Sequence, residues 1–333
     1  MATVGIIANP AAGKDIRRLV AHGRFVPNHE KVNILKRILV GLDAAGVERV
    51  VMMPDASMLG KSAIDGSKLK LAVEFLDMSV FNEERDSTKA AEMMAEARAG
   101  CIITLGGDGT NRSVAKSSGD VPLIPVSTGT NNVFPVMIEG TVAGMAAGAL
   151  ACGRVDLEKV STVAMRLDIY VDGAPRDIAL IDVAICRERF VGARAIWDMN
   201  TIHEIFLSRA EPASIGLSAI GAHLLPSCTG DTTGVYARLG PGATNVLVPV
   251  APGMITPVGV EEWRPMAIGE MIEIKLRPCT VALDGERTLT LLPQHTAHVS
   301  LNERGPRVVS VEAVMREAAL NGVFKSRTEI DAA

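Results

Sequence analysis

The stretch "IITLGGDGTN", from Ile102 to Asn111, places two glycines, an aspartate and a third glycine directly after an apolar run. An ordinary strand-to-helix turn can be made with fewer special residues. Glycines allow positive φ angles and carry no side chain, so the backbone N–H groups of such a turn can converge on an anion. A helix that starts near Thr110 would aim the positive end of its dipole at the same place. The stretch therefore predicts a corner that handles phosphate and hydroxyl groups at the end of a β-strand.

Asp108 lies between two of these glycines. Its carboxylate could accept a proton from a substrate hydroxyl or hold Mg²⁺. The alternative is that Asp108 only caps the following helix, because Asp is among the best N-cap residues. A cap explains Asp108 but not the pair Gly106-Gly107 before it, so we favour a functional role.

The residues on both sides of this corner alternate between strand and helix patterns. Expected strands are "TVGIIANP", "VERVVMM", "KLAVEFL", "CIITLGG" and "VPLIPVS". Four helices are expected between these strands. The first begins at Asp15, a possible N-cap, and the second is "EKVNILKRILVGLDAA", which ends at Gly46. The third is capped near Ser87, and the fourth is a run of small residues that ends at Gly153. Continuously apolar strands that alternate with helices indicate a parallel sheet covered on both faces.

The pattern changes near residue 155. The stretch "TVAMRLDIYVDGAPRDIALIDVAIC" predicts two strands about an Asp-Gly turn, and "ARAIWDMNTIHEIFLSR" predicts one helix. Closely spaced strand-like runs follow, namely "GVYARLG", "TNVLVPVAPG", "MIEIKLRPCTVAL", "RTLTLLP" and "AHVSL". Such runs, separated by turns, favour a mainly antiparallel β domain. The tail "GPRVVSVEAVMREAALNGVF" predicts a strand and a final helix.

A chain of 333 residues suits two domains. We predict an N-terminal Rossmann-like, doubly wound α/β domain over residues 1–154 that carries the GGDGT motif. A mainly antiparallel β-sandwich domain is expected over residues 155–304. Residues 305–333 are expected to return toward the N-terminal domain.

Composition and charge argue against several classes of protein. The net charge is −4 without a block of like charges, so the basic stripe of a nucleic-acid or anionic-membrane surface is missing. No apolar run is long enough for a membrane span, and the N-terminus "MATVGIIANP" lacks the cationic region of a secretory signal. The five cysteines show no C-x-x-C spacing. We expect a cytoplasmic protein whose partners are small nucleotides, not nucleic acid or membrane.

Two further polar corners, "ANPAAGK" and "PVSTGTNN", follow predicted strands. In a doubly wound sheet, ligands bind at the carboxyl ends of the strands. Asn side chains in the second corner, Ser127 to Asn132, could recognise ribose hydroxyls or an adenine edge, although an Asn-rich turn is the simpler alternative. In the first, Asn9 and Gly13 could approach a phosphate, but the Walker A spacing is absent and a plain turn is equally open.

Two acidic positions stand out in the second half. Asp182 lies inside the apolar run "IALIDVAIC", where a carboxylate is costly unless it is paired or faces a cleft. It could instead pair with Arg187 or Arg189, or lie on a solvated face. Asp284-Gly285-Glu286 lies between two strands, and by pattern alone it is a hairpin turn.

Together these residues resemble the superfamily that unites NAD kinases with diacylglycerol and sphingosine kinases. Gly106 to Thr110 matches the G-G-D-G-T signature completely. "ANPAAGK" is similar to the opening N-P-x-x-G corner, "PVSTGTNN" to the P-x-G-T-x-N and G-x-N motifs, and Asp284 to Glu286 to the late D-G-E motif. A closer likeness, over most of the chain, is to the acetoin-catabolism X proteins, an ATP-NAD kinase-like subgroup. It is carried by "NPAAGKDIRRLVAHG", "NHEKVNILKRIL", "ICRERFVGARAIWD" and "VALDGERTL".

The resemblance implies roles for these residues. Asp108 would be the base that activates the acceptor hydroxyl. The nucleotide and its phosphates would be bound by Asn9, Gly106, Gly107, Gly109, Thr110, Gly129, Thr130 and either Asn131 or Asn132. Asp182, Asp284 and Glu286 would contact the acceptor. Asp182 falls where NAD kinases carry Asn-Glu, but the residue before it is Ile181, a departure from that pattern.

The resemblance implies Mg²⁺-assisted transfer of the ATP γ-phosphoryl group to a hydroxyl, with the 2′-hydroxyl of NAD as the first choice of acceptor. ATP and Mg²⁺ are the expected cofactors, and polyphosphate is an alternative donor. Two alternatives stay open: a lipid or alcohol kinase of the diacylglycerol kinase type, and a non-catalytic nucleotide-binding accessory protein of acetoin catabolism. A homo-oligomer, dimer or tetramer, is also expected from the superfamily.

Overall fold

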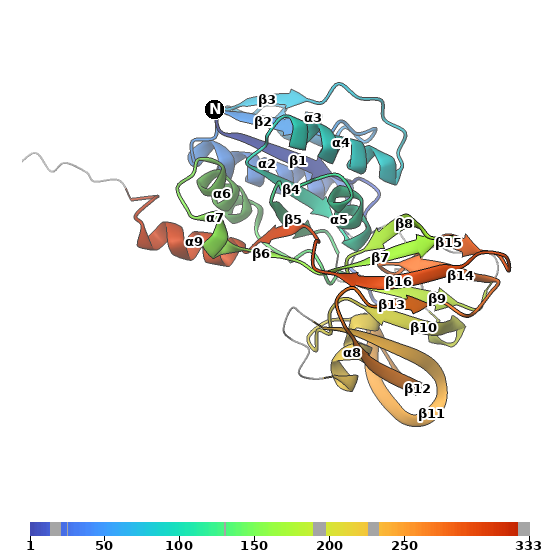
Figure 1. Ribbon diagram of the computed structural model, residues 1–333. Helices are drawn as coiled ribbons and strands as arrows, with labels where there is room; N and C mark the ends of the chain where they lie inside the picture. The colour runs from blue at the N-terminus through green and yellow to red at the C-terminus, as the bar shows by residue number, and fades with distance from the viewer. Residues whose placement is uncertain (14–20, 25, 130, 189–197, 226–232, 326–333) are drawn as a thin grey trace, which may run out of the picture.

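The computed structural model describes residues 1–13, 21–24, 26–129, 131–188, 198–225 and 233–325. It shows an α/β part and a β part that meet along one side (Figure 1). The helix expected to begin at Asp15 lies outside the described residues.

A seven-stranded sheet forms the α/β part. Its strand order is β3-β2-β1-β4-β5-β17-β6. The strands are β1 (Thr3–Ala8), β2 (Arg49–Met52), β3 (Ala72–Phe75), β4 (Cys101–Gly106), β5 (Leu123–Ser127), β6 (Ser161–Val163) and β17 (Arg307–Val309). Neighbouring strands from β3 to β17 pair in parallel, and β6 pairs antiparallel with β17. The predicted parallel α/β sheet is confirmed.

Helices cover both faces of this sheet. On one face α2 (Asn28–Ala44), α6 (Gly140–Ala151) and α9 (Val311–Leu320) share a buried cluster with Val4 and Ile6. On the other face α4 (Glu84–Glu96) and α5 (Asp108–Ala115) share a cluster with Ile7 and Ile102. Alternate residues of a strand point to opposite faces, so a strand buried by helices on both sides must be apolar throughout. The short helices α3 (Leu59–Ile64) and α7 (Leu157–Val160) complete this part.

Helix boundaries follow local signals with one correction. Gly46 has a φ of 79° just after α2, as expected for the residue that ends a helix. The helix expected to be capped near Ser87 instead begins at Glu84, with Glu83 and Asp86 forming a capping box. Ser87 lies buried inside α4, because the earlier capping box supplies the unpaired amides with acceptors.

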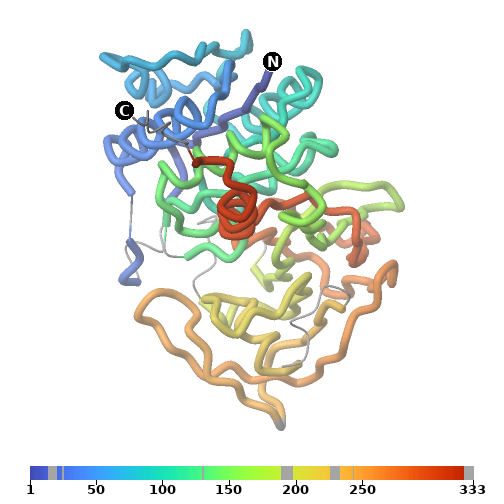
Figure 2. The backbone as a smooth tube through the Cα atoms, turned by 90° about the vertical axis from the view of Figure 1, so that its left-hand side faces the viewer, coloured from blue at the N-terminus to red at the C-terminus, as the bar shows by residue number. Residues whose placement is uncertain are grey.

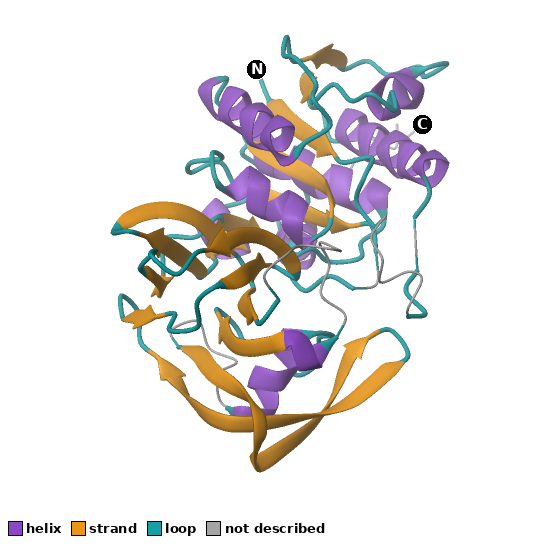
Figure 3. Cartoon of the chain, turned by 90° about the vertical axis from the view of Figure 1, so that its right-hand side faces the viewer, coloured by secondary structure: helices purple, strands orange, loops and turns teal. Residues whose placement is uncertain are grey.

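Two antiparallel sheets form the β part. The six-stranded sheet has the order β12-β11-β10-β9-β14-β15, and the four-stranded sheet has the order β13-β16-β7-β8. The strands are β7 (Arg166–Val171), β8 (Ala174–Ala179), β9 (Asp182–Cys186), β10 (Ile202–Leu207), β11 (Gly234–Ala251), β12 (Met254–Met266), β13 (Met271–Glu273), β14 (Cys279–Leu283), β15 (Glu286–Leu291) and β16 (Ala297–Asn302). One buried cluster draws on both sheets, so they pack face to face as the predicted sandwich. Helix α8 (Leu217–Leu224) covers the other face of the larger sheet, inside the curve of the β11–β12 hairpin (Figure 3).

The helix predicted for "ARAIWDMNTIHEIFLSR" is wrong over its second half. Residues Ile202–Leu207 form β10, which pairs with β9 on one side and β11 on the other. Residues 189–197 lie outside the described part, and Met199–Thr201 is a short 3₁₀ turn. The apolar residues of Ile202–Leu207 do not alternate regularly with polar ones, so the pattern of this stretch alone cannot be told from that of a buried helix.

The predicted Asp-Gly hairpin is present, but its second strand is divided. Asp172 and Gly173 have φ angles of 52° and 79° and connect β7 to β8, as a type I′ turn requires. The continuous run that follows separates into β8 and β9, which belong to different sheets. The chain therefore crosses from one sheet to the other at Leu180 and Ile181.

Two long-range connections join the parts. Strand β17 follows the sandwich and inserts beside β5, so the tail of the chain returns to the first sheet. The tip of the β11–β12 hairpin reaches the segment around His22, whose N–H donates to the Pro252 carbonyl at 2.9 Å (Figure 2). Within the described residues, no helix combines the length and apolarity that a membrane crossing needs.

Candidate functional site

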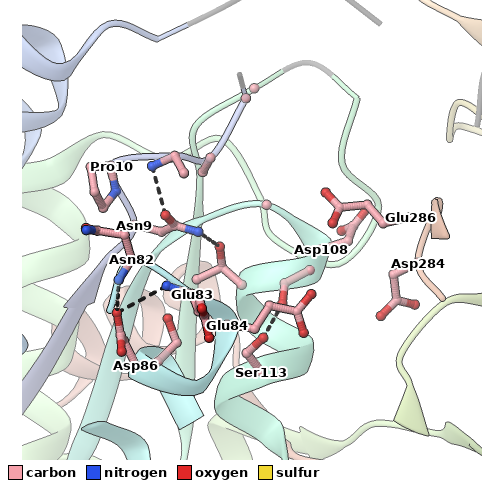
Figure 4. Close-up of a pocket in the computed structure, with 18 of the residues that line it drawn as sticks. Asn9, Pro10, Asn82, Glu83, Glu84, Asp86, Asp108, Ser113, Asp284 and Glu286 are labelled. Atoms are coloured by element: carbon pink, nitrogen blue, oxygen red, sulfur yellow. Dashed lines mark hydrogen bonds between the residues drawn. The ribbon is translucent and has the colours of Figure 1, made fainter. Parts of the chain in front are cut away.

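A cleft of about 1000 Å³ lies at the carboxyl ends of β1, β4 and β5, opposite the turn between β14 and β15 (Figure 4). Most of the residues predicted from the sequence line it: Asn9, Gly107, Asp108, Gly109, Thr110, Gly129, Asn131, Asn132, Asp284 and Glu286. Gly106 and Asp182 do not line it, and Thr130 lies outside the described residues. Residues far apart in sequence thus meet where a parallel sheet places its ligands.

Asp108 is the first residue of α5, but its side chain does not cap that helix. Its carboxylate instead accepts the N–H groups of Val133, at 3.1 Å, and Phe134, at 2.8 Å. These bonds fix the orientation of the carboxylate, and Figure 4 shows Asp108 beside Glu286 of the β14–β15 turn. The simple N-cap interpretation of Asp108 is therefore wrong.

The corner that contains Asn9 contacts the GGDGT corner directly. The Asn9 amide donates to the Thr110 hydroxyl at 2.9 Å and accepts the Ala11 N–H at 2.8 Å. A Cβ atom on Gly106 would lie 2.6 Å from the Thr110 Cβ, so glycine is needed there for close packing. Gly106 thus packs against Thr110 and does not line the cleft.

The third corner, Ser127 to Asn132, packs against the GGDGT corner. Asn132 donates to the Ser127 hydroxyl at 2.8 Å, and the Ser127 hydroxyl donates to the Gly129 carbonyl at 2.8 Å. A Cβ atom on Gly107 would lie 2.8 Å from the Asn132 amide oxygen. Asn132 therefore packs on the glycine turn, while both Asn131 and Asn132 line the cleft.

The turn at Asp284 is built by side chains as well as by backbone. Asp284 has a φ of 51° and accepts the N–H groups of Leu180, at 3.0 Å, and Ile181, at 2.8 Å. Asp182 in return accepts the Gly285 N–H at 3.2 Å. The two carboxylates thus hold the β14–β15 turn against the start of β9. Asp182, a predicted acceptor contact, is a buried support of that turn and lies off the cleft.

Arg112 is a charged residue at this site that the sequence analysis missed. Its side chain is fully buried, and its guanidinium lies 2.9 Å from Glu84, 3.4 Å from Asp177 and 3.7 Å from Asp284. Burial raises the pKa of Asp284 to about 7, against the opposing pull of Arg112 and the Ile181 N–H. Asp284 thus lies in a buried ion cluster that joins the two parts of the molecule.

Lys31 is a second residue that the sequence analysis missed. It lies in the first turn of α2 with 0% of its surface exposed. Its ammonium donates to the carbonyls of Asn9 and Pro10, both at 3.1 Å, and Ala12, at 3.0 Å. The sequence carries a signal for the burial of Lys31, because helical spacing places it on the same face of α2 as the apolar residues Leu35 and Ile38.

The carboxylates beside the cleft could take part in metal binding together with a bound ligand. Within the described ranges, no group of three or more His, Cys, Asp and Glu residues is placed to hold a metal ion. Glu286 lies about 3.8 Å from where a Cβ on Gly109 would be, so the glycine leaves room for this carboxylate close to Asp108. Mg²⁺ commonly takes one or two carboxylates plus substrate phosphates, and this donor set fits that mode.

Comparisons with known proteins agree with the division of the chain into α/β and β parts. Residues 4–154 match the family model of the ATP-NAD kinase N-terminal domain, and residues 165–304 match that of the acetoin catabolism protein X C-terminal domain. The chain is 39% identical over 338 residues to acetoin catabolism protein X of Cupriavidus necator, covering 97% of this chain and 94% of that protein. The chain belongs to the acetoin catabolism protein X family. Its N-terminal domain is NAD kinase-like, and the family supports a kinase-like or accessory role.

The solved structures that align with this chain are much more distant in sequence. A diacylglycerol kinase-like protein of Bacillus anthracis str. Sterne aligns with a TM-score of 0.46 at 15% identity, over 94% of this chain and 98% of that chain. Yeast NADH kinase complexed with NADH aligns with a TM-score of 0.46 at 13% identity, over 99% of this chain and 90% of that chain.

Proposed function

We propose that this member of the acetoin catabolism protein X family is a phosphotransferase that moves the γ-phosphoryl group of ATP to a hydroxyl group. The 2′-hydroxyl of NAD is the acceptor we would test first. The observation that carries the proposal is the placement of Asp108 in a cleft where three glycine- and asparagine-bearing corners meet. The N-terminal family match supports the same chemistry.

The size of the cleft supports two substrates. Its volume of about 1000 Å³ is at the upper end of typical ligand pockets, which span roughly 300–1000 Å³. Phosphoryl transfer brings a donor phosphate and an acceptor hydroxyl into line, and catalysis comes mainly from positioning and charge stabilisation. A cleft lined by residues of both parts of the molecule suits that task.

Asp108 would act as the proton acceptor. The amides of Val133 and Phe134 hold its carboxylate in one orientation, so little reorganisation is needed when the acceptor hydroxyl arrives. The positive end of α5 and the glycine backbone from Gly106 to Gly109 would bind the transferring phosphate. Glu286, next to the open space at Gly109, would hold Mg²⁺ together with the substrate phosphates. Bound Mg²⁺ would neutralise charge on those phosphates.

The test is incubation of the pure protein with ATP, Mg²⁺ and NAD, followed by measurement of the NADP formed. Asp108→Asn keeps the size of the side chain and removes the base, so we expect the rate to fall about 100-fold or more. Asp120→Asn, at an exposed position beyond α5, is the matched control and should keep the full rate. Equal rates for the Asp108 variant and the parent protein would exclude the proposed base.

A second candidate is a nucleotide-binding accessory protein that does not catalyse transfer. It is favoured by Asp182, which supports the Asp284 turn and does not contribute a carboxylate to the cleft. Calorimetry with ATP and with NAD separates the two proposals. Binding without NADP formation, and without release of ADP in the presence of other alcohols, would favour the accessory role.

A further inference from the structure

The corner formed by residues 9–13 contains a buried cation. Lys31 is fully enclosed, and three carbonyl oxygens of one short loop lie 3.0–3.1 Å from its nitrogen. Three acceptors need three N–H donors, which only the charged ammonium form supplies. A charge in such a place is costly to bury, and an apolar side chain would satisfy the packing of α2 without that cost.

We propose that Lys31 is a positioning residue for a phosphate group bound at this corner, as part of a nucleotide or polyphosphate chain. The inference rests on the proposed function, since it assigns one part of the same cleft to the phosphate chain. No contact between Lys31 and the ligand is required. Lys31 acts through the loop that it holds.

The geometry of the peptide bond explains how the loop would bind an anion. In a trans peptide the carbonyl and the following N–H point in opposite directions. Because the Pro10 and Ala12 carbonyls point at Lys31, the N–H groups of Ala11 and Gly13 point away from it. Both residues line the cleft. The Ala11 N–H is already bonded to the Asn9 side chain, so within this loop the Gly13 N–H is the donor that a phosphate would meet. Gly13 has a φ of 78°, which favours glycine at the end of the turn.

Charge and connectivity add to this arrangement. Lys31 places a full positive charge behind the loop, where low dielectric lets it act strongly on a nearby anion. The same loop is joined to the GGDGT corner through the bond between Asn9 and Thr110. A phosphate group bound at residues 9–13 and one bound at the start of α5 would therefore belong to the phosphate chain of a single ligand.

The test compares Lys31→Met with Lys36→Met by calorimetry, using ATP, inorganic tripolyphosphate and adenosine as probes. Lys36 is on the same helix but exposed, so its substitution removes an equal charge. We expect Lys31→Met to lose at least tenfold in affinity for ATP and tripolyphosphate, with adenosine affinity unchanged within twofold. Lys36→Met should bind all probes as the parent does.

The outcomes separate this inference from the proposed function. A parent protein that binds neither ATP nor tripolyphosphate would overturn both. Parent binding that Lys31→Met retains in full would overturn only the role of Lys31. An equal loss for adenosine and ATP would show that Lys31 merely holds the fold, and would overturn the inference as well. If Lys31→Met fails to fold, Lys31→Gln removes the charge while it keeps an N–H donor, and the same comparison applies.

Discussion

At the scale of a residue, Glu204 on β10 shows how burial alone can tune stability. The residue is 3% exposed, and its Oε2 has no hydrogen-bond partner among the described residues. Burial raises its pKa to about 7, against the pull of Arg238 and Lys275. The folded protein thus binds this proton more tightly than the unfolded chain. Stability that Glu204 contributes at low pH should be lost as the pH rises from about 4.5 to about 7.

We therefore expect Glu204→Gln to stabilise the protein at pH 8 by about 2 to 3 kcal/mol and to change little near pH 4.5. Urea unfolding across this pH range measures the difference. Glu303→Gln, at an exposed position, is the control and should follow the parent protein at every pH. A constant offset between Glu204→Gln and the parent at all pH values would contradict the prediction.

At the scale of an element, the helix pair α2 and α6 depends on glycine. A Cβ atom on Gly41 would collide with the Thr141 carbonyl, and one on Gly144 with the Ile38 carbonyl. The backbones approach too closely for any side chain. The run of small residues in α6 is therefore a packing surface. The same closeness lets both helices cover the sheet together with α9.

Gly144→Ala should accordingly destabilise the protein by about 1 to 3 kcal/mol, because the helices must move apart, even though alanine has the higher helix propensity. Thermal unfolding followed by circular dichroism measures this. Val142→Ala, on an exposed position of α6, should shift the melting temperature much less. A Gly144→Ala variant as stable as the parent would show that the interface can relax.

At the scale of the whole molecule, Arg112 joins the two parts. Its guanidinium on α5 meets Glu84 on α4, Asp177 on β8 and Asp284 in the β14–β15 turn. Removing one partner of a buried ion cluster leaves the other charges uncompensated, which costs about 3 to 5 kcal/mol. The cost here falls on a contact between the α/β part and the β part, because Glu84 belongs to the first and Asp177 and Asp284 to the second.

Arg112→Met should thus lower stability by about 3 to 5 kcal/mol and weaken the coupling between the two parts. Differential scanning calorimetry should show the loss, with a broadened or divided transition. The comparison variant is Arg238→Met, which breaks partly exposed pairs with Glu261 and Glu262 inside the β part alone. If both variants unfold in a single transition at the parent temperature, Arg112 does not couple the two parts.

The sequence by itself determined the parallel α/β sheet, the antiparallel character of the second half and the corners that meet in the cleft. These features depend on local properties: apolar strands buried on both faces, glycine turns at strand ends, and the Asp172-Gly173 hairpin. The resemblance to the superfamily also placed Asp108 and the Asp284 turn in one site. The periodic pattern of apolar and polar residues predicts strands and helices from local sequence, without information about which distant residues they contact.

Only the tertiary structure decided which elements meet and which charges are buried. It showed that Ile202–Leu207 is a strand, because β9 and β11 pair with it on both sides. It moved Asp182 from the cleft to a supporting position, and it revealed Arg112 and Lys31 as buried cations. The partners of these residues lie tens of residues away or more, and local pattern does not identify them, although the place of Lys31 on the apolar face of α2 indicates its burial. Long-range contacts therefore define the final geometry of the site.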